Sequence, residues 1–113
     1  MGGDAMFGTV PIIGATLLVP FLSAGCAPDG PSAPAAYVIS CMPCHGDGLG
    51  GAPKTGDQDD WASRISKGMA KVRTNAIDGF EGSTGVMPAK GGRVDLSDDE
   101  ITALVDYMVE TSR

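Results

Sequence analysis

The amino-acid sequence predicts a small all-α domain. Its 113 residues are enough for one domain rather than two. Several segments place apolar residues at helical spacing between residues that favour helix ends. No segment alternates apolar and polar residues as a half-buried strand does, except weakly residues 92–96. The loops 46–56 and 79–95 are long and rich in glycine, so a group other than regular secondary structure must organise them.

The first helix is expected over residues 34–42, because a proline suits the first turn of a helix. The second is expected after Asp57, where Trp61 and Ile65 stand four residues apart and share one face. Gly68 is expected to end it, since glycine commonly follows a helix.

The third helix is expected from Met69 and closes at Gly79. The fourth is the clearest, because Ser97 and Glu100 have the spacing of a capping box. One apolar stripe at helical period follows, formed by Ile101, Leu104, Val105 and Met108.

The N-terminal part has a different character. Residues 5–28 carry no charge, and the apolar run ends in small residues and Cys26. This pattern predicts a signal peptide over residues 1–25 whose lipobox-like end directs lipidation of Cys26. An uncleaved anchor or an ordinary cleaved signal stays open, because the first eight residues lack Lys and Arg. Residues 26–33 have linker composition, and the folded domain is expected over residues 34–113.

Charge narrows the choice of partners. The chain carries 14 acidic and 8 basic residues, a net charge of −6. Residues 94–113 hold six of the acids against one base. Such a protein is expected to avoid nucleic acid and to be steered by charge toward a protein partner.

Cys41, Cys44 and His45 form the most informative motif, a Cys-x-x-Cys-His segment that contains the only histidine of the chain. A redox dithiol needs a strand before it and a sheet around it, and neither is predicted. A zinc site needs four ligands, and this segment supplies three. The remaining interpretation is covalent haem attachment, with two thioether bonds and an adjacent imidazole ligand for the iron.

The second axial ligand is then expected to be a methionine, because no histidine remains. Met87 is favoured, since it stands in a long glycine-rich loop and is followed by a stiffening proline. Met69 is the weaker alternative. Met42 lies inside the attachment motif, and Met108 lies on the apolar stripe of the last helix, where packing is its expected role.

The ordered series of the Cys41–His45 motif, "GAPK" at residues 51–54, Trp61, and Met87-Pro88 resembles the class I c-type cytochromes, close to the bacterial cytochrome c5 family. The resemblance covers about residues 35–110. It implies the small cytochrome c fold, with four to five short helices around one covalent haem c.

The resemblance also implies roles for single residues. Pro53 would accept a hydrogen bond from the His45 ring, and Trp61 and Arg64 would lie near the haem propionates. Tyr37 would meet Tyr107 or Leu104 where the first and last helices cross. Many members carry a cysteine pair before the last helix, and this chain has Arg93 and Leu96 there.

With both axial positions filled, the expected function is one-electron transfer rather than enzymatic catalysis. Methionine–histidine ligation raises the reduction potential, which suits a respiratory chain. The expected partners are a quinol-oxidising complex and a terminal oxidase or reductase. The expected location is the periplasm, with attachment to the membrane through lipidated Cys26 or an N-terminal anchor. The alternative is a haem-based sensor or peroxidase-like enzyme in which Met87 leaves the iron.

Overall fold

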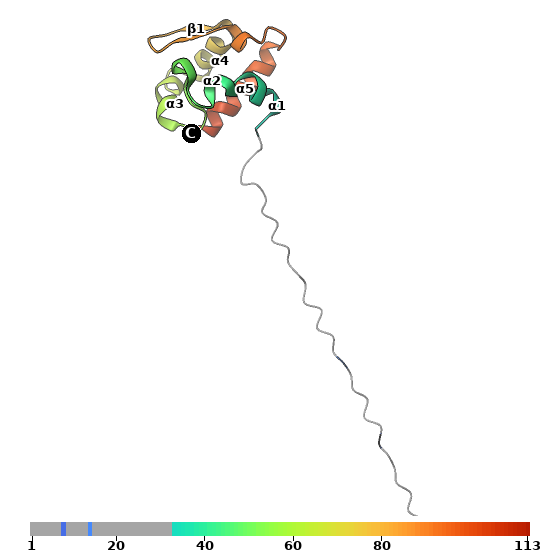
Figure 1. Ribbon diagram of the computed structural model, residues 1–113. Helices are drawn as coiled ribbons and strands as arrows, with labels where there is room; N and C mark the ends of the chain where they lie inside the picture. The colour runs from blue at the N-terminus through green and yellow to red at the C-terminus, as the bar shows by residue number, and fades with distance from the viewer. Residues whose placement is uncertain (1–7, 9–13, 15–32) are drawn as a thin grey trace, which may run out of the picture.

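The computed structural model describes Gly8, Gly14 and residues 33–113. Apart from Gly8 and Gly14, the predicted signal peptide lies outside these residues, as do the lipidation site Cys26 and most of the predicted linker. The described domain is mainly helical (Figure 1). Its elements are α1 Ala35–Ser40, α2 Met42–His45, η1 Leu49–Gly51, α3 Gln58–Ile65, α4 Met69–Asp78, β1 Phe80–Glu81, β2 Val86–Met87, η2 Ala89–Gly92 and α5 Asp98–Thr111.

The helix predicted over residues 34–42 is in fact two helices. α1 ends at Ser40, Cys41 forms the junction with φ −107°, and α2 begins at Met42. Pro43 explains the break, because proline has no N–H to continue the hydrogen bonds of α1 but is tolerated in the first turn of a new helix. The second, short helix therefore carries the end of the Cys-x-x-Cys-His motif.

The other three predicted helices are confirmed, with one shorter than expected. The Asp57 carboxylate accepts from the Asp60 N–H and caps α3, which ends at Ile65 before Gly68 is reached. α4 begins at Met69 and ends before Gly79, as predicted.

α5 has the predicted capping box. The Ser97 hydroxyl accepts from the Glu100 N–H at 3.2 Å, and the Glu100 carboxylate accepts from the Ser97 N–H at 2.8 Å. These two bonds satisfy N–H groups that the first turn of a helix leaves without partners. The start of the longest helix is thus determined locally.

The loop 79–95 contains a short antiparallel hairpin that the sequence did not predict. β1 pairs with β2 in the register Phe80↔Met87 and Glu81↔Val86, and the Gly82 N–H donates to the Gly85 carbonyl at the turn. Two-residue strands are too short to show alternation. The weak strand prediction for residues 92–96 is wrong, because that segment ends η2 and turns into α5.

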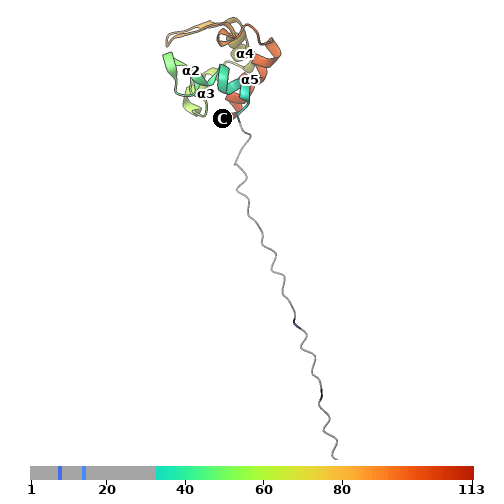
Figure 2. The ribbon, with the colours of Figure 1, turned by 45° about the vertical axis from the view of Figure 1, so that its right-hand side comes forward.

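The core lies between α5 and the helices around it. The Tyr37 ring of α1 meets the Tyr107 ring of α5 edge to face, with centroids 5.0 Å apart, as the resemblance implied. α4 packs on α5, and the Arg73 guanidinium holds both Asp106 oxygens at 2.8 and 2.9 Å. Figures 1 and 2 both show the hairpin at the top of the domain, above α2 and α3. No described helix has the length and hydropathy needed to cross a membrane.

Candidate functional site

A cavity of about 760 Å³, which we also call the chamber, lies at the centre of the described domain. Its walls come from α2, η1, α3, α4, the hairpin, η2 and α5. The cavity brings together all the site residues that the sequence predicted, namely Cys41, Cys44, His45, Pro53, Trp61 and Met87. Its volume lies in the range of about 300–1,000 Å³ that is usual for ligand and cofactor sites.

The attachment segment presents its reactive groups on one side of α2. Both cysteines are free thiols, Cys41 half-buried and Cys44 exposed, and both line the cavity. One helical turn, closed by the His45 N–H donating to the Cys41 carbonyl at 2.9 Å, turns the imidazole inward. Burial raises the pKa of the Cys41 thiol, and the nearby Arg93 charge partly offsets this.

The His45 imidazole is buried and held in one orientation. Its Nδ1 donates to the Pro53 carbonyl oxygen at 2.8 Å, which leaves Nε2 as the nitrogen with a lone pair for a metal. Burial lowers the pKa of His45, the Pro53 carbonyl acts in the opposite direction, and the Arg64 charge lowers the pKa further. The neutral imidazole that a metal requires is therefore the favoured form.

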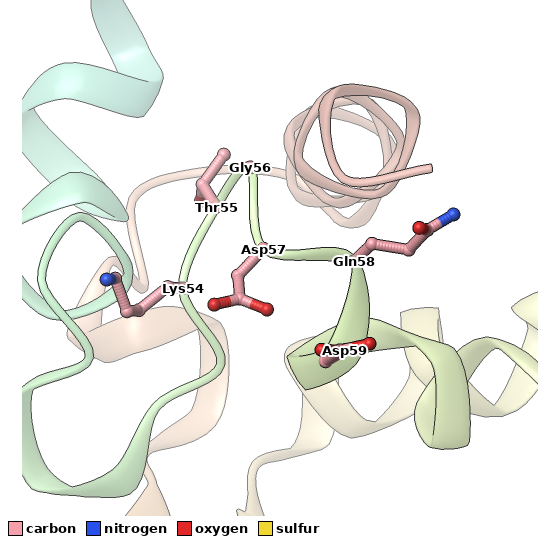
Figure 3. A pocket seen from close by; sticks show the side chains of 6 residues that line it. All are labelled: Lys54, Thr55, Gly56, Asp57, Gln58 and Asp59. Atoms are coloured by element: carbon pink, nitrogen blue, oxygen red, sulfur yellow. The ribbon is translucent and has the colours of Figure 1, made fainter.

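The segment Lys54–Asp59 fixes the position of the Pro53 carbonyl from outside the cavity. Figure 3 shows this segment, which lines a shallow surface hollow of about 380 Å³. The Trp61 indole N–H donates to the Lys54 carbonyl at 2.8 Å, and the Asp60 carboxylate accepts from the Lys54 N–H at 3.0 Å. The indole N–H is thus engaged by the backbone, and Trp61 faces the cavity with its ring.

A third attachment of this segment comes from the far end of the chain. The Ser112 hydroxyl, nearly fully buried, accepts from the Gly56 N–H at 2.8 Å and donates to the Met108 carbonyl at 2.6 Å. Sequence reasoning missed Ser112, because a serine near a helical C-terminus carries no local signal of a distant partner. α5 therefore supports the loop that orients His45.

Met87 ends β2 and lines the cavity half-buried. Gly79 lies directly beneath it, since a Cβ on Gly79 would come within 3.1 Å of the Met87 carbonyl. Neither Met69 nor Met42 lines the cavity. Met108 does, but it is 3% exposed and belongs to the hydrophobic core.

The walls suit a flat apolar group that carries acidic substituents. Aliphatic, aromatic, methionine and glycine residues form most of the lining, and no Asp or Glu is among the described lining residues. The charged lining residues are all cationic, namely Arg64, Lys67, Lys71 and Lys90. Haem, with its apolar macrocycle and two propionates, fits this chamber. In the described part of the chain no group of three or more His, Cys, Asp or Glu side chains could hold a metal ion.

The domain is small and helical, and it places two thiols and an imidazole on the wall of one apolar chamber. This arrangement is typical of proteins that bind haem covalently. The comparisons agree. Residues 29–108 match the family model described as "Cytochrome C oxidase, cbb3-type, subunit III". The chain is 41% identical to cytochrome c-555 of Chlorobaculum tepidum over 95% of this chain and 97% of that protein. It is 39% identical to cytochrome c5 of Ectopseudomonas mendocina over 60% of this chain and 76% of that protein.

A solved structure shares the fold. A chain of the "Crystal structure of electron transfer complex of nitrite reductase with cytochrome c" superposes with a TM-score of 0.62. The two are 28% identical, and the match covers 74% of this chain and 98% of that one.

The chain belongs to the class I c-type cytochromes of the c5 type. It is an electron-transfer protein rather than an enzyme, and it binds one covalently attached haem c. Its partners are redox proteins.

Proposed function

We propose that Cys41 and Cys44 form the two thioether bonds to haem and that His45 and Met87 are its axial ligands. The observation that supports this most directly is that both thiols, the imidazole and the Met87 side chain line one apolar chamber. When bound, the haem iron supplies the one-electron change between the ferric and ferrous states. With two protein ligands no axial position is left for a substrate, so the chain serves as a carrier.

The residues around the chamber have distinct tasks in this proposal. The Pro53 carbonyl raises the basicity of His45 as a ligand through the hydrogen bond to Nδ1. Arg64, Lys67 and Lys71 provide positive charge for the propionates. The Trp61 ring, whose centroid lies 6.1 Å from that of His45, keeps water from the imidazole.

Electrons are proposed to pass at the edge framed by the attachment segment and the Met87 segment. Met42 is 46% exposed and Val86 69% exposed, so both are available for a small apolar contact. Lys90 is a poor docking charge, because its ammonium is held by the Asp98 carboxylate at 2.8 Å and the Leu96 carbonyl at 2.8 Å. Lys54, which is exposed, is the proposed flanking charge of this edge.

The carrier is proposed to work in the periplasm, between a quinol-oxidising complex and a terminal oxidase or reductase. The nitrite reductase complex of the structural neighbour supports a terminal reductase as one kind of partner. Attachment to the membrane through lipidated Cys26 or an N-terminal anchor is proposed from the uncharged run that precedes Cys26. Such attachment would restrict diffusion to the membrane surface.

The ligand assignment is tested by replacing the methionines that line the chamber. Met87→Ala should remove the absorption band of methionine–iron ligation and allow carbon monoxide to bind the ferrous protein. Met87→His should keep six ligands and lower the reduction potential. Met108→Leu is the matched control and should leave both properties unchanged. An unchanged spectrum in Met87→Ala would assign the ligand elsewhere, and rapid carbon monoxide binding to the unsubstituted protein would favour the sensor or peroxidase-like alternative.

A further inference from the structure

The tip of the hairpin meets the η1 turn at one edge of the chamber. In both Figure 1 and Figure 2 the free end of the hairpin lies beside the green η1 segment. We name this contact the glycine seam, formed by Gly50 and Gly51 on one side and Thr84 and Gly85 on the other. All four residues line the cavity. The seam therefore joins the segment that follows His45 to the segment that leads to Met87.

The seam is too tight for a side chain on either face. A Cβ on Gly51 would lie 2.1 Å from the Thr84 carbonyl oxygen, and a Cβ on Gly85 would lie 2.1 Å from the Gly50 carbonyl oxygen. Both obstacles are backbone atoms, which a rotamer change cannot move. Gly50 differs, because a Cβ there would meet nothing within 4 Å.

The base of the hairpin is held separately from its tip. Gly79 approaches the backbone of residues 87–89 there, and η2 packs against α4 just beyond. No backbone hydrogen bond within the described residues crosses the seam, so its two sides meet through close packing of backbone atoms. The strands have two residues each, and the register Phe80↔Met87 places Met87 at the end of the ladder. Only Val86 separates Gly85 at the tip from Met87, so a displaced tip would pull on the segment that carries the Met87 side chain.

We propose that Gly51 and Gly85 are positioning residues for Met87. By allowing the backbones to touch, they hold the hairpin tip down, keep the thioether inside the chamber and close this edge of the chamber to small ligands. The inference rests on the proposed role of Met87 as an axial ligand. It adds a reason for two glycines that the ligation chemistry does not itself require.

The test uses holoprotein with Gly51→Ala and, separately, Gly85→Ala. Gly92→Ala is the matched control, since Gly92 has nearly the same φ (85°) as Gly51 (81°) but has room for a methyl group and does not line the cavity. Gly68→Ala imposes a comparable backbone strain (φ 97°) outside the cavity and controls for general destabilisation. Carbon monoxide should combine with the ferrous seam variants at least about tenfold faster, because the fraction of open molecules rises, and the controls should stay within about twofold of the parent.

A second measurement is independent of the iron. The Gly82 N–H, bonded to the Gly85 carbonyl at 2.9 Å, should exchange with solvent faster in Gly51→Ala than in Gly92→Ala. If both seam variants match Gly92→Ala while Met87→Ala binds carbon monoxide rapidly, the seam proposal is wrong and the ligand assignment stands. If Met87→Ala itself leaves carbon monoxide binding unchanged, the ligand assignment fails first. Faster exchange at Gly82 without faster carbon monoxide binding would also overturn the positioning role.

Discussion

Trp61→Phe should loosen the segment that follows Pro53 and destabilise the domain. The indole is 3% exposed, and its N–H donates to the Lys54 carbonyl, the residue directly after Pro53. Phenylalanine keeps an aromatic ring beside His45 but removes both the donor and the second ring. The change therefore separates the support of the Lys54–Asp59 segment from the presence of an aromatic wall.

The expected loss can be worked from two contributions. The missing ring atoms correspond to roughly two buried methylene groups, each worth about 0.8 kcal/mol. The lost hydrogen bond contributes about 1 kcal/mol. We therefore expect the free energy of unfolding to fall by about 2.5 kcal/mol. In a domain of this size that corresponds to a fall in Tm of at least about 10 °C.

The assay is guanidinium unfolding of the holoprotein at neutral pH, followed by circular dichroism and by haem absorption. The two transitions should coincide, which is required for a two-state free energy. Ser66→Ala is the control, because it removes an exposed hydrogen bond, to the Ser63 carbonyl at 2.9 Å, and should change stability by less than about 0.5 kcal/mol. A loss below about 1 kcal/mol in Trp61→Phe would refute the argument that this hydrogen bond and its packing anchor the segment.

Trp61→Phe should also raise the reduction potential. A looser Pro53 carbonyl would accept a weaker hydrogen bond from His45, and a less basic imidazole stabilises the ferric state less. A loss of stability with an unchanged potential would show that Trp61 holds the segment but not the Pro53 carbonyl.

Further predictions concern attachment, charge and export. Acid–acetone extraction should leave haem on the polypeptide, and the double change Cys41→Ala, Cys44→Ala should release it. Arg93→Gln should destabilise the protein more than Arg73→Gln, because Arg93 holds the Ser40 hydroxyl next to Cys41 as well as the Asp95 carboxylate, while Arg73 holds Asp106 alone. Arg93 lowers the pKa of Asp95 to about 2, below its unfolded value, so the ion pair stabilises the fold at neutral pH. That stabilisation is lost as the pH falls from about 4 through 2. Asp95→Asn should therefore flatten this part of a plot of the free energy of unfolding against pH. Mass spectrometry of the exported protein should find lipidated Cys26 at the N-terminus, and residues 1–25 still attached would favour an anchor instead.

The sequence by itself determined the chemistry and most of the helices. The two cysteines and the histidine of the attachment motif lie within five residues, so their spacing alone predicts haem attachment. The capping box of Ser97 and Glu100 is a contact between residues three apart, and the structure confirms it. Local contacts of this kind depend only on neighbouring residue types, which a sequence displays directly.

Only the tertiary structure shows which long-range contacts hold these helices and loops together. Arg93 reaches Ser40 and Ser112 reaches Gly56, contacts between residues 53 and 56 positions apart, and no periodicity announces either pair. The sequence did not predict the hairpin, because its two-residue strands are too short to show an alternation of apolar and polar residues. It did not predict the glycine seam either, because glycine is common in any loop. Such contacts depend on where the packing of α5 places distant backbone segments. The sequence therefore predicted which groups would bind haem, while the tertiary structure determined which backbone atoms hold them in place.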